Sequence, residues 1–126
     1  MKELVLVGKA LADASRVRAL YALVGEDLCV CELCDALDLT QSTLSTHLQV
    51  MREAGLVITR KEGKWIYYGI DPEKKSVITS LFRFFEGGLV NDRVMRADRK
   101  RLQRRLAERE NGLCCRGFTG AKTKCC

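Results

Sequence analysis

Residues 32–54 read ELCDALDLTQSTLSTHLQVMREA, and this stretch decides the fold. Apolar residues at helical spacing predict a short helix in its first part and a longer helix in its second part. Asp38-Leu39-Thr40 separates them and reads as a tight turn, with Thr40 as the N-cap of the longer helix. A short helix, a tight turn and a second helix are typical of a helix-turn-helix. The apolar positions are Val30, Leu33 and Leu37, then Leu44, Leu48 and Met51.

The second helix of this motif carries a face of small polar side chains. Short donors and acceptors of this kind reach base edges or phosphates in the major groove of DNA. Any amphipathic surface helix also has a polar face, so the helix alone does not decide between the two readings. The candidate DNA-reading residues are Gln41, Ser42, Thr43, Ser45, Thr46 and His47.

Two β-favouring runs, 56–59 and 65–70, follow directly and flank the charged segment 60–64, RKEGK. This pattern predicts a β-hairpin. A basic hairpin after a helix-turn-helix is the layout of a winged helix, in which Arg60, Lys61 and Lys64 track the DNA backbone or an adjacent minor groove. The expected fold class is therefore mainly α with a β-hairpin wing. Trp65 and Tyr67 share one strand face, where packing is a more common role than base stacking.

The flanking segments complete the expected domain. Apolar spacing predicts a helix in the first dozen residues, a second from Ser15 to Gly25, and a third that opens at Asp71-Pro72 and breaks at Gly87-Gly88. Residues 90–110 predict a basic, largely exposed amphipathic helix. The remaining residues form a cysteine-bearing tail without periodicity, for which disorder is the expectation. We expect residues 1–88 to form the DNA-binding and dimerisation domain and residues 89–126 the basic helix and tail.

Bulk composition limits the function. A chain of 126 residues is the size of one domain, and its net charge of +6 favours a polyanionic partner. No apolar run approaches the length of a membrane span, so we expect a cytoplasmic protein. Seven cysteines in a reducing compartment are not expected to form a disulfide framework, which leaves metal binding or redox chemistry.

Three of the cysteines lie close together in Cys29-Val-Cys31-Glu-Leu-Cys34, and their sulfurs are soft ligands for thiophilic ions. On a regular helix, at about 100° per residue, Cys31 and Cys34 share a side and Cys29 does not. The three sulfurs converge only if Cys29 lies at or before the helix start, where the helix N-terminus favours thiolates. Two alternatives remain open: buried core cysteines, and a thiol-redox sensor that forms a Cys31–Cys34 disulfide. The pairs Cys114-Cys115 and Cys125-Cys126 are candidates for a second site.

The segments 26–34, 41–48 and 56–65 together resemble the arsenic-responsive repressors of the ArsR/SmtB family. The resemblance implies a homodimeric winged-helix repressor, not an enzyme, that releases operator DNA when arsenite or antimonite is captured by Cys29, Cys31 and Cys34. No cysteine precedes Cys29, as cadmium and lead sensors of the family would require, and the last helix has no histidine for a zinc or nickel site. The implied dimer contact joins the first and last helices of the winged-helix domain through Leu4, Val7, Leu11, Val77, Ile78, Leu81 and Phe85.

Overall fold

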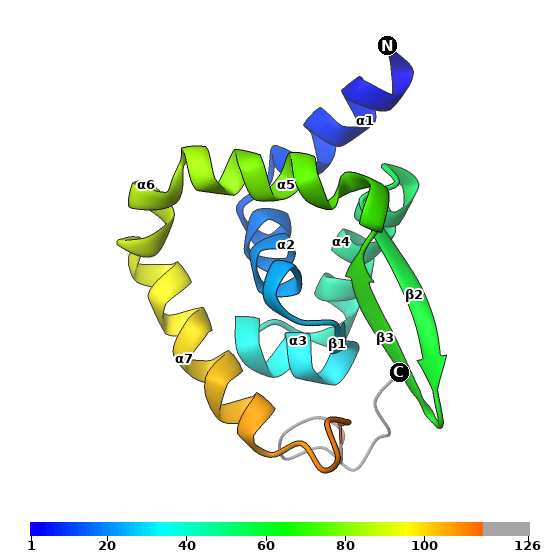
Figure 1. Cartoon of the computed structure of the whole chain (residues 1–126), viewed down its shortest axis with the longest axis vertical. Helices are drawn as coiled ribbons and strands as arrows, with labels where there is room; N and C mark the ends of the chain where they lie inside the picture. Colours follow the sequence, from blue (N-terminus) through cyan, green and yellow to red (C-terminus); the bar gives the residue numbers. More distant parts are fainter. Residues whose placement is uncertain (115–126) are drawn as a thin grey trace.

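The computed structural model describes residues 1–114, which form seven helices and three strands around one principal core. Figure 1 shows helix α5 crossing one end of the molecule, α1 projecting beyond it, the hairpin on one edge and α7 on the opposite edge. The elements are α1 (Lys2–Leu11), α2 (Ala14–Gly25), β1 (Leu28–Cys29), α3 (Val30–Leu37), α4 (Gln41–Glu53), β2 (Val57–Glu62), β3 (Trp65–Ile70), α5 (Pro72–Phe84), α6 (Glu86–Val90) and α7 (Arg93–Ala107).

The helix-turn-helix is confirmed as α3, a turn and α4. Asp38 ends α3 in the left-handed conformation, with φ of 54°, and the Thr40 side chain then accepts a hydrogen bond from the backbone N–H of Thr43. Gly55 follows α4 with φ of 74°, a conformation that favours glycine and turns the chain into the hairpin.

The wing is confirmed as strands β2 and β3, paired antiparallel from Val57↔Ile70 to Glu62↔Trp65. A third strand was not predicted: β1 pairs antiparallel with β3 through Leu28↔Tyr68 and Cys29↔Tyr67, which gives the strand order β1-β3-β2. Two residues are too few to show a period-2 pattern. The pairing matters for function because β3 connects the wing directly to the residue that begins α3.

Three sequence-based expectations need correction. The second helix is capped by Asp13, whose side chain accepts from the backbone N–H of Arg16, so it starts before Ser15. The helix after Pro72 ends at Phe85, and Gly87 and Gly88 lie inside the short helix α6 rather than breaking a helix. A single turn residue, Phe85, separates the two helices.

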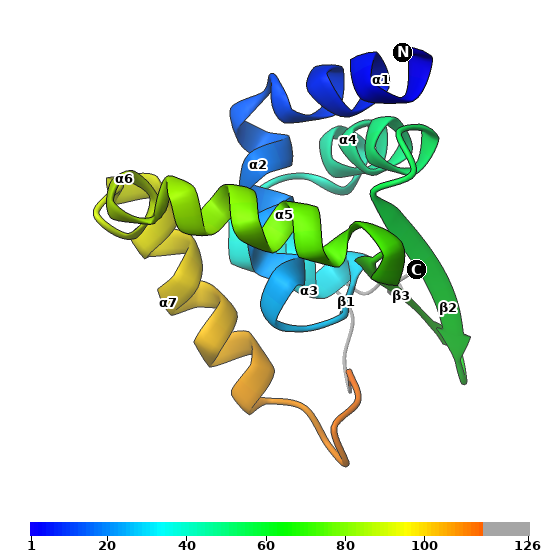
Figure 2. The same cartoon turned by 45° about the horizontal axis from the view of Figure 1, so that its top comes forward.

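The third correction concerns the inner face of α7, although most of its residues are exposed, as expected. The helix packs along α3, as Figures 1 and 2 show. Met95, Asp98 and Arg105 are buried on its inner face. The hydrophobic signal of this helix is weak because its inner face is built from charged residues with partners. Among residues 1–114, no helix is long and apolar enough to cross a membrane.

Candidate functional site

Three cysteine sulfurs meet in one buried cluster, which we call the thiol cluster: Cys29, Cys31 and Cys114. Their Sγ atoms all lie within 4.8 Å of one another. The Cys29 and Cys31 sulfurs are 2.8 Å apart, and the Cys31 and Cys114 sulfurs are 3.4 Å apart. All three residues are buried. Soft sulfur atoms gathered at this distance form a chelating set for a thiophilic ion.

Cys29 and Cys31 approach each other because Cys29 is outside the helix. It is the N-cap of α3, with extended backbone angles (φ −80°, ψ 166°), and it is also the last residue of β1. Cys29 thus lies before the start of the helix, as the sequence analysis required for its sulfur to approach that of Cys31. The two sulfurs are together without any unwinding of α3.

Cys34 lies in a different place from the other sequence-predicted ligands. It packs in the principal core with Leu33, Leu37 and Leu44, and it is not part of the thiol cluster. Its carbonyl oxygen accepts from the backbone N–H groups of Asp38 and Leu39, the bonds that close the turn between α3 and α4. The position of Cys34 is thus a link between α3 and α4.

Cys114 reaches the cluster because the segment after α7 returns to the start of α3. Three arginines spaced four residues apart dock that segment on α3. Arg101 donates to the carbonyl of Ala36 at 2.9 Å, and Arg105 pairs with Asp35 at 2.9 Å. Arg109 binds the carboxylate of Glu32 through two nitrogens, at 2.7 and 2.8 Å, and the carbonyl of Asp27 at 2.7 Å.

Buried charges surround the thiol cluster in compensating pairs. Glu32 is 0% exposed, and besides Arg109 it accepts from the backbone N–H of Cys29 at 3.1 Å. This carboxylate raises the pKa of Arg109, so the guanidinium stays charged. Arg105 is also buried, and its Nη2 donates to the sulfurs of Cys31 at 3.4 Å and Cys114 at 3.6 Å. One buried guanidinium thus bridges the sulfurs of two chain segments.

Aromatic residues of the wing strand close the cluster on another side. Trp65 and Tyr67 are buried against the three cysteines. The Tyr67 hydroxyl accepts from the backbone N–H of Cys114 at 2.7 Å, and burial is the main cause that raises the Tyr67 pKa above its usual 10.0. Packing is therefore the role of both aromatics, as expected. The cluster lies where α3, the wing and the segment after α7 meet.

The candidate DNA-reading residues on α4 divide into two groups. Gln41, Ser42, Thr43, Ser45 and Thr46 are exposed on one surface of the helix. His47 is half-buried and turned toward the start of α2, with its Nδ1 3.2 Å from Arg16 Nη1 and 3.8 Å from Asp13 Oδ1. The structure therefore gives His47 a contact between helices, while the other five side chains are available to a partner.

The basic residues of the wing also differ from one another. Lys61 is exposed, and Lys64 is exposed with its ammonium 5.0 Å from the centre of the Trp65 ring. Arg60 pairs with Asp27 at 3.1 Å and with Glu62, and it stacks over Tyr67 at 4.7 Å. Arg60 is thus held against the sheet, whereas both lysines extend from the tip.

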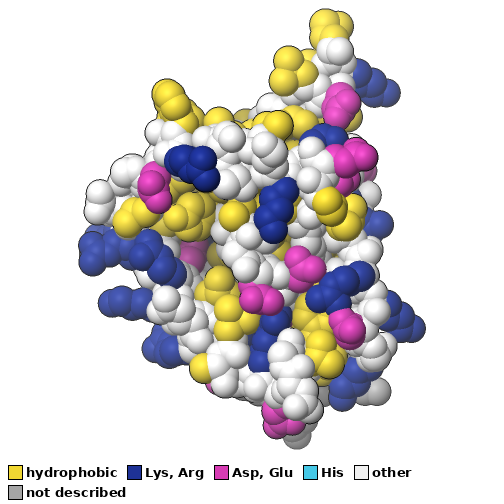
Figure 3. All heavy atoms as spheres, in the orientation of Figure 1, with side chains coloured by type: hydrophobic (Ala, Val, Ile, Leu, Met, Phe, Trp, Pro, Cys, Tyr) yellow, Lys and Arg dark blue, Asp and Glu magenta, His cyan; other side chains and the backbone are white. Residues whose placement is uncertain are grey.

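An apolar surface covers α1 and α5. Leu4, Val77, Phe84 and Phe85 are exposed by 74, 62, 81 and 55%. Figure 3 shows apolar side chains at the projecting end of α1. Ile78, which the sequence assigned to a contact between subunits, is buried in the chain's own core.

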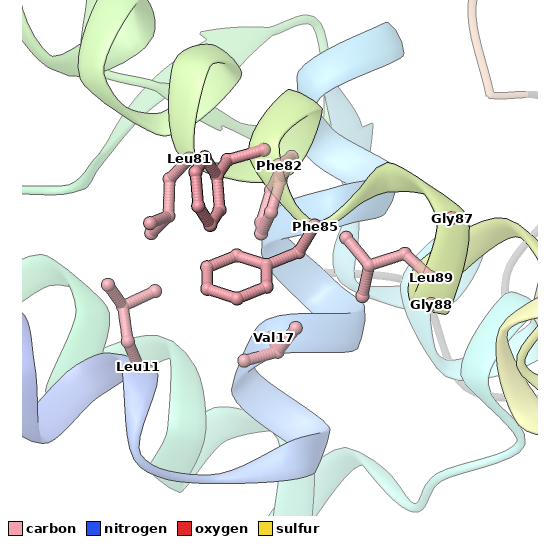
Figure 4. A pocket seen from close by; sticks show the side chains of 9 residues that line it. Leu11, Val17, Leu81, Phe82, Phe85, Gly87, Gly88 and Leu89 are labelled. Atoms are coloured by element: carbon pink, nitrogen blue, oxygen red, sulfur yellow. The ribbon is translucent and has the colours of Figure 1, made fainter.

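A pocket of about 700 Å³ opens beside α5 on this surface. Figure 4 shows Phe85 lying between Leu81 and Phe82 on one side and Leu11 and Val17 on the other. Residues that the sequence placed at a subunit interface therefore do lie next to one another.

Sequence reasoning missed Cys114, Arg105, Arg109 and Tyr67 as parts of the site. One signal was available: Arg101, Arg105 and Arg109 recur at the spacing of one helix face, which a randomly basic surface helix does not require. The turn at 111–112, where both residues have positive φ, then sends the chain back toward α3. Cys115, Cys125 and Cys126 lie outside the described residues.

Comparison with known proteins agrees with this geometry. Residues 13–59 match the family described as "Bacterial regulatory protein, arsR family". The chain is 40% identical over 79 residues to "Arsenic resistance transcriptional regulator ArsR1" of Pseudomonas putida, covering 62% of each chain. It is 48% identical over 66 residues to "Arsenical resistance operon repressor" of Escherichia coli, covering 51% of this chain and 56% of that one. The matches thus span about three fifths of these relatives' lengths.

A cadmium-related protein and solved structures match as well. "Cadmium resistance transcriptional regulatory protein CadC homolog" of Staphylococcus aureus is 41% identical over 68 residues, covering 53% of this chain and 56% of that one. HlyU from Vibrio cholerae has a TM-score of 0.61 at 39% identity, covering 67% of this chain and 92% of that one. The "homodimeric winged helix-turn-helix DNA-binding domain" of Mb0332 from Mycobacterium bovis has a TM-score of 0.64 at 27% identity, covering 73% and 86%. The chain belongs to the arsR family of bacterial regulatory proteins, whose fold is that of DNA-binding regulators and not of enzymes.

Proposed function

We propose that the protein is a transcriptional repressor that binds operator DNA as a homodimer and leaves it when As(III) or Sb(III) binds the thiolates of Cys29 and Cys31. One observation carries the proposal: the thiol cluster lies where α3 and wing strand β3 meet. Since α3 leads into α4 through one tight turn, a change at the cluster reaches both elements that face DNA.

The exposed polar side chains of α4 support direct reading of DNA, and the two lysines at the wing tip support phosphate contacts. We infer that Gln41, Ser42, Thr43, Ser45 and Thr46 approach the major groove and that Lys61 and Lys64 hold the backbone. His47 and Arg60 then have structural roles. His47 contacts Arg16 and so joins α4 to α2. Arg60 pairs with Asp27 and so holds the wing in place.

The donor set supports As(III) over a harder or more highly coordinated ion. As(III) forms three bonds to sulfur, and among the described residues the cluster offers three sulfurs with no histidine or carboxylate in the same group. A structural zinc ion takes four ligands in a closed site. Cadmium-type relatives exist, so Cd(II) is the competitor that an experiment must include.

Binding exchanges As–O bonds for As–S bonds. Arsenite, As(OH)3, reacts with each thiol to form one As–S bond and release one water, so arsenic remains As(III) and no oxidant is consumed. Where a sulfur is already a thiolate, the hydroxide that leaves takes up one proton from solvent. Drawing sulfurs of β1 and α3 onto one atom fixes their relative position, and we propose that this position is incompatible with the DNA-bound arrangement.

The test is a fluorescence-anisotropy titration with a labelled duplex selected for binding from a random-sequence pool. Under reducing conditions, As(III) should release the wild-type chain, whereas Cd(II) should release it less effectively. Cys29→Ser and Cys31→Ser should bind the duplex normally and stay bound when As(III) is added. Release of both variants at the wild-type As(III) concentration would disprove the proposal.

A thiol-redox sensor is the second candidate, and one observation favours it: Cys31 is disulfide-bonded. The expected pairing of Cys31 with Cys34 is wrong, because Cys34 is not in a disulfide. Such a sensor would release DNA when treated with peroxide and would rebind after reduction, in the complete absence of arsenic. An As(III) sensor requires the reduced thiol and responds in the presence of reductant. Running the same titration with peroxide alone, and with As(III) plus reductant, therefore separates the two functions.

A further inference from the structure

We propose that Cys114, rather than Cys34, supplies the third sulfur of the As(III) site, so that the segment following α7 is part of the sensor. This inference rests on the proposed function, because it names the ligand set of the same site. In this arrangement the arginine-rich helix α7 has a function, because it positions Cys114.

The distances support a site of three sulfurs. With metal–sulfur bonds of about 2.3 Å and bond angles near 100°, three sulfurs around one atom would lie about 3.5 Å apart. The Cys31–Cys114 separation is 3.4 Å, the Cys29–Cys31 separation is 2.8 Å, and no pair exceeds 4.8 Å. Once Cys31 is reduced, its sulfur and those of Cys29 and Cys114 are already near the spacing of the bound geometry. Cys34 is outside this group and packs in the principal core.

Cys114 is held in place by contacts that do not require an ion. Its backbone N–H donates to the Tyr67 hydroxyl, and a bridge between Glu110 and Leu113 closes the preceding turn. Arg109 donates to the carbonyl of Gly112 at 3.3 Å while its other nitrogens hold Glu32 of α3. A ligand that is positioned before binding loses less conformational entropy when the ion arrives. The segment is therefore preorganised as a third donor.

Arg105 adds an electrostatic reason. Its buried Nη2 lies within 3.6 Å of the sulfurs of Cys31 and Cys114, one from each of the two chain segments that the site would join. A guanidinium shared by two sulfurs keeps the two segments aligned. We assign Arg105 a positioning role, because in this arrangement it contacts sulfurs and carboxylates.

The chemistry of the third bond is the same exchange as for the first two. The Cys114 thiol forms an As–S bond, the last hydroxide of the arsenite leaves as water, and arsenic stays As(III). The product links Cys29 of β1, Cys31 of α3 and Cys114 of the C-terminal segment. Arsenic would thus link the segment after α7 to the start of α3.

The experiment uses the full chain with Cys115→Ser, Cys125→Ser and Cys126→Ser as the background, so that no neighbouring cysteine replaces Cys114. Cys114→Ser and Cys34→Ser are then compared in that background under reducing conditions. Arsenic K-edge X-ray absorption counts the sulfurs bound to As(III). Fluorescence of Trp65, the single tryptophan, follows binding because its ring packs against the cluster.

The background should retain three As–S bonds. Cys114→Ser should reduce them to two and weaken As(III) binding by about a hundredfold, since one arm of the chelate is lost. Cys34→Ser should keep three As–S bonds and the background affinity. Cys114→Ala gives a second variant in case serine disturbs folding, and circular dichroism confirms that each variant is folded.

Two results would overturn the inference while leaving the proposed function intact: loss of a sulfur in Cys34→Ser but not in Cys114→Ser, or only two As–S bonds in the background itself. A background chain that binds no As(III), or a Cys29→Ser, Cys31→Ser double variant of the background that still binds As(III) with the background affinity, would instead reject the proposed function. The two failures are therefore distinguishable.

Discussion

Glu32 shows how a single side chain ties the candidate site to the stability of the fold. It is fully buried at the start of α3, where it caps the backbone N–H of Cys29 and binds both Arg109 nitrogens. A buried carboxylate is tolerated only while its partners remain, because the desolvation cost of the charge is large. The pair thus holds together two segments that are 77 positions apart.

Arg109→Ala should lower the free energy of unfolding by about 3–5 kcal/mol, because it leaves Glu32 buried without its cation. Arg104→Ala is the matched control: it removes an exposed arginine from α7 and should change stability by no more than about 0.5 kcal/mol. Urea denaturation followed by circular dichroism measures both values. Equal effects of the two substitutions would show that the Glu32 contact does not stabilise the fold.

The buried phenol of Tyr67 predicts a loss of stability at high pH. Burial raises its pKa above 10.0 in the folded protein, so the neutral phenol is favoured by folding. Its contribution is fully present below the unfolded pKa and is lost as pH rises through the folded pKa. Above about pH 10, the free energy of unfolding should therefore fall more steeply in wild type than in Tyr67→Phe. Parallel pH profiles of the two proteins would contradict this account.

Individual capping residues could be predicted from sequence, and the third thiol could not. Thr40 and Asp71 sit at the junctions where local chemistry alone favours a cap, and both side chains accept the expected backbone hydrogen bond. Cys114 reaches the cluster only through contacts of Arg109 and Tyr67 with residues far away in the chain. Local pattern holds no information about such contacts.

Among the elements, those with a strong apolar period were predicted correctly. Helices α3, α4 and α5 and the hairpin of β2 and β3 each bury one regular face. The failures are β1, which is too short for a period, and α6, because Gly87-Gly88 was expected to break the helix there. Helix α7 was predicted, but its packing on α3 through ion pairs was not, since charged side chains give no hydrophobic signal.

The wing should bind phosphates in a way that depends on salt. Lys61→Ala should weaken DNA binding and reduce the slope of log K against log salt concentration by about 1, because the variant neutralises one phosphate fewer. Lys100→Ala, which removes an exposed lysine from α7, is the control and should leave the slope unchanged. Anisotropy titrations at several salt concentrations measure the slopes. Identical slopes for Lys61→Ala and wild type would remove the wing from the DNA interface.

For the whole molecule, the exposed apolar surface of α1 and α5 predicts self-association, because large apolar patches mark interfaces. Phe85→Asp should shift the protein from dimer to monomer in sedimentation-velocity runs and weaken DNA binding. The control, Ile58→Asp, changes an exposed apolar residue on β2 and should remain dimeric. A Phe85→Asp protein that sediments as wild type would place the interface elsewhere.

The proposed function requires that As(III) binding at the thiol cluster and DNA binding be energetically coupled. Such coupling is reciprocal: if As(III) weakens DNA binding by some factor, DNA must weaken As(III) binding by the same factor. The most direct test measures the As(III) dissociation constant from Trp65 fluorescence, with and without saturating duplex, beside the duplex dissociation constant with and without As(III). We predict two equal factors, each of about tenfold or more. An As(III) affinity that is the same with and without DNA would contradict the account.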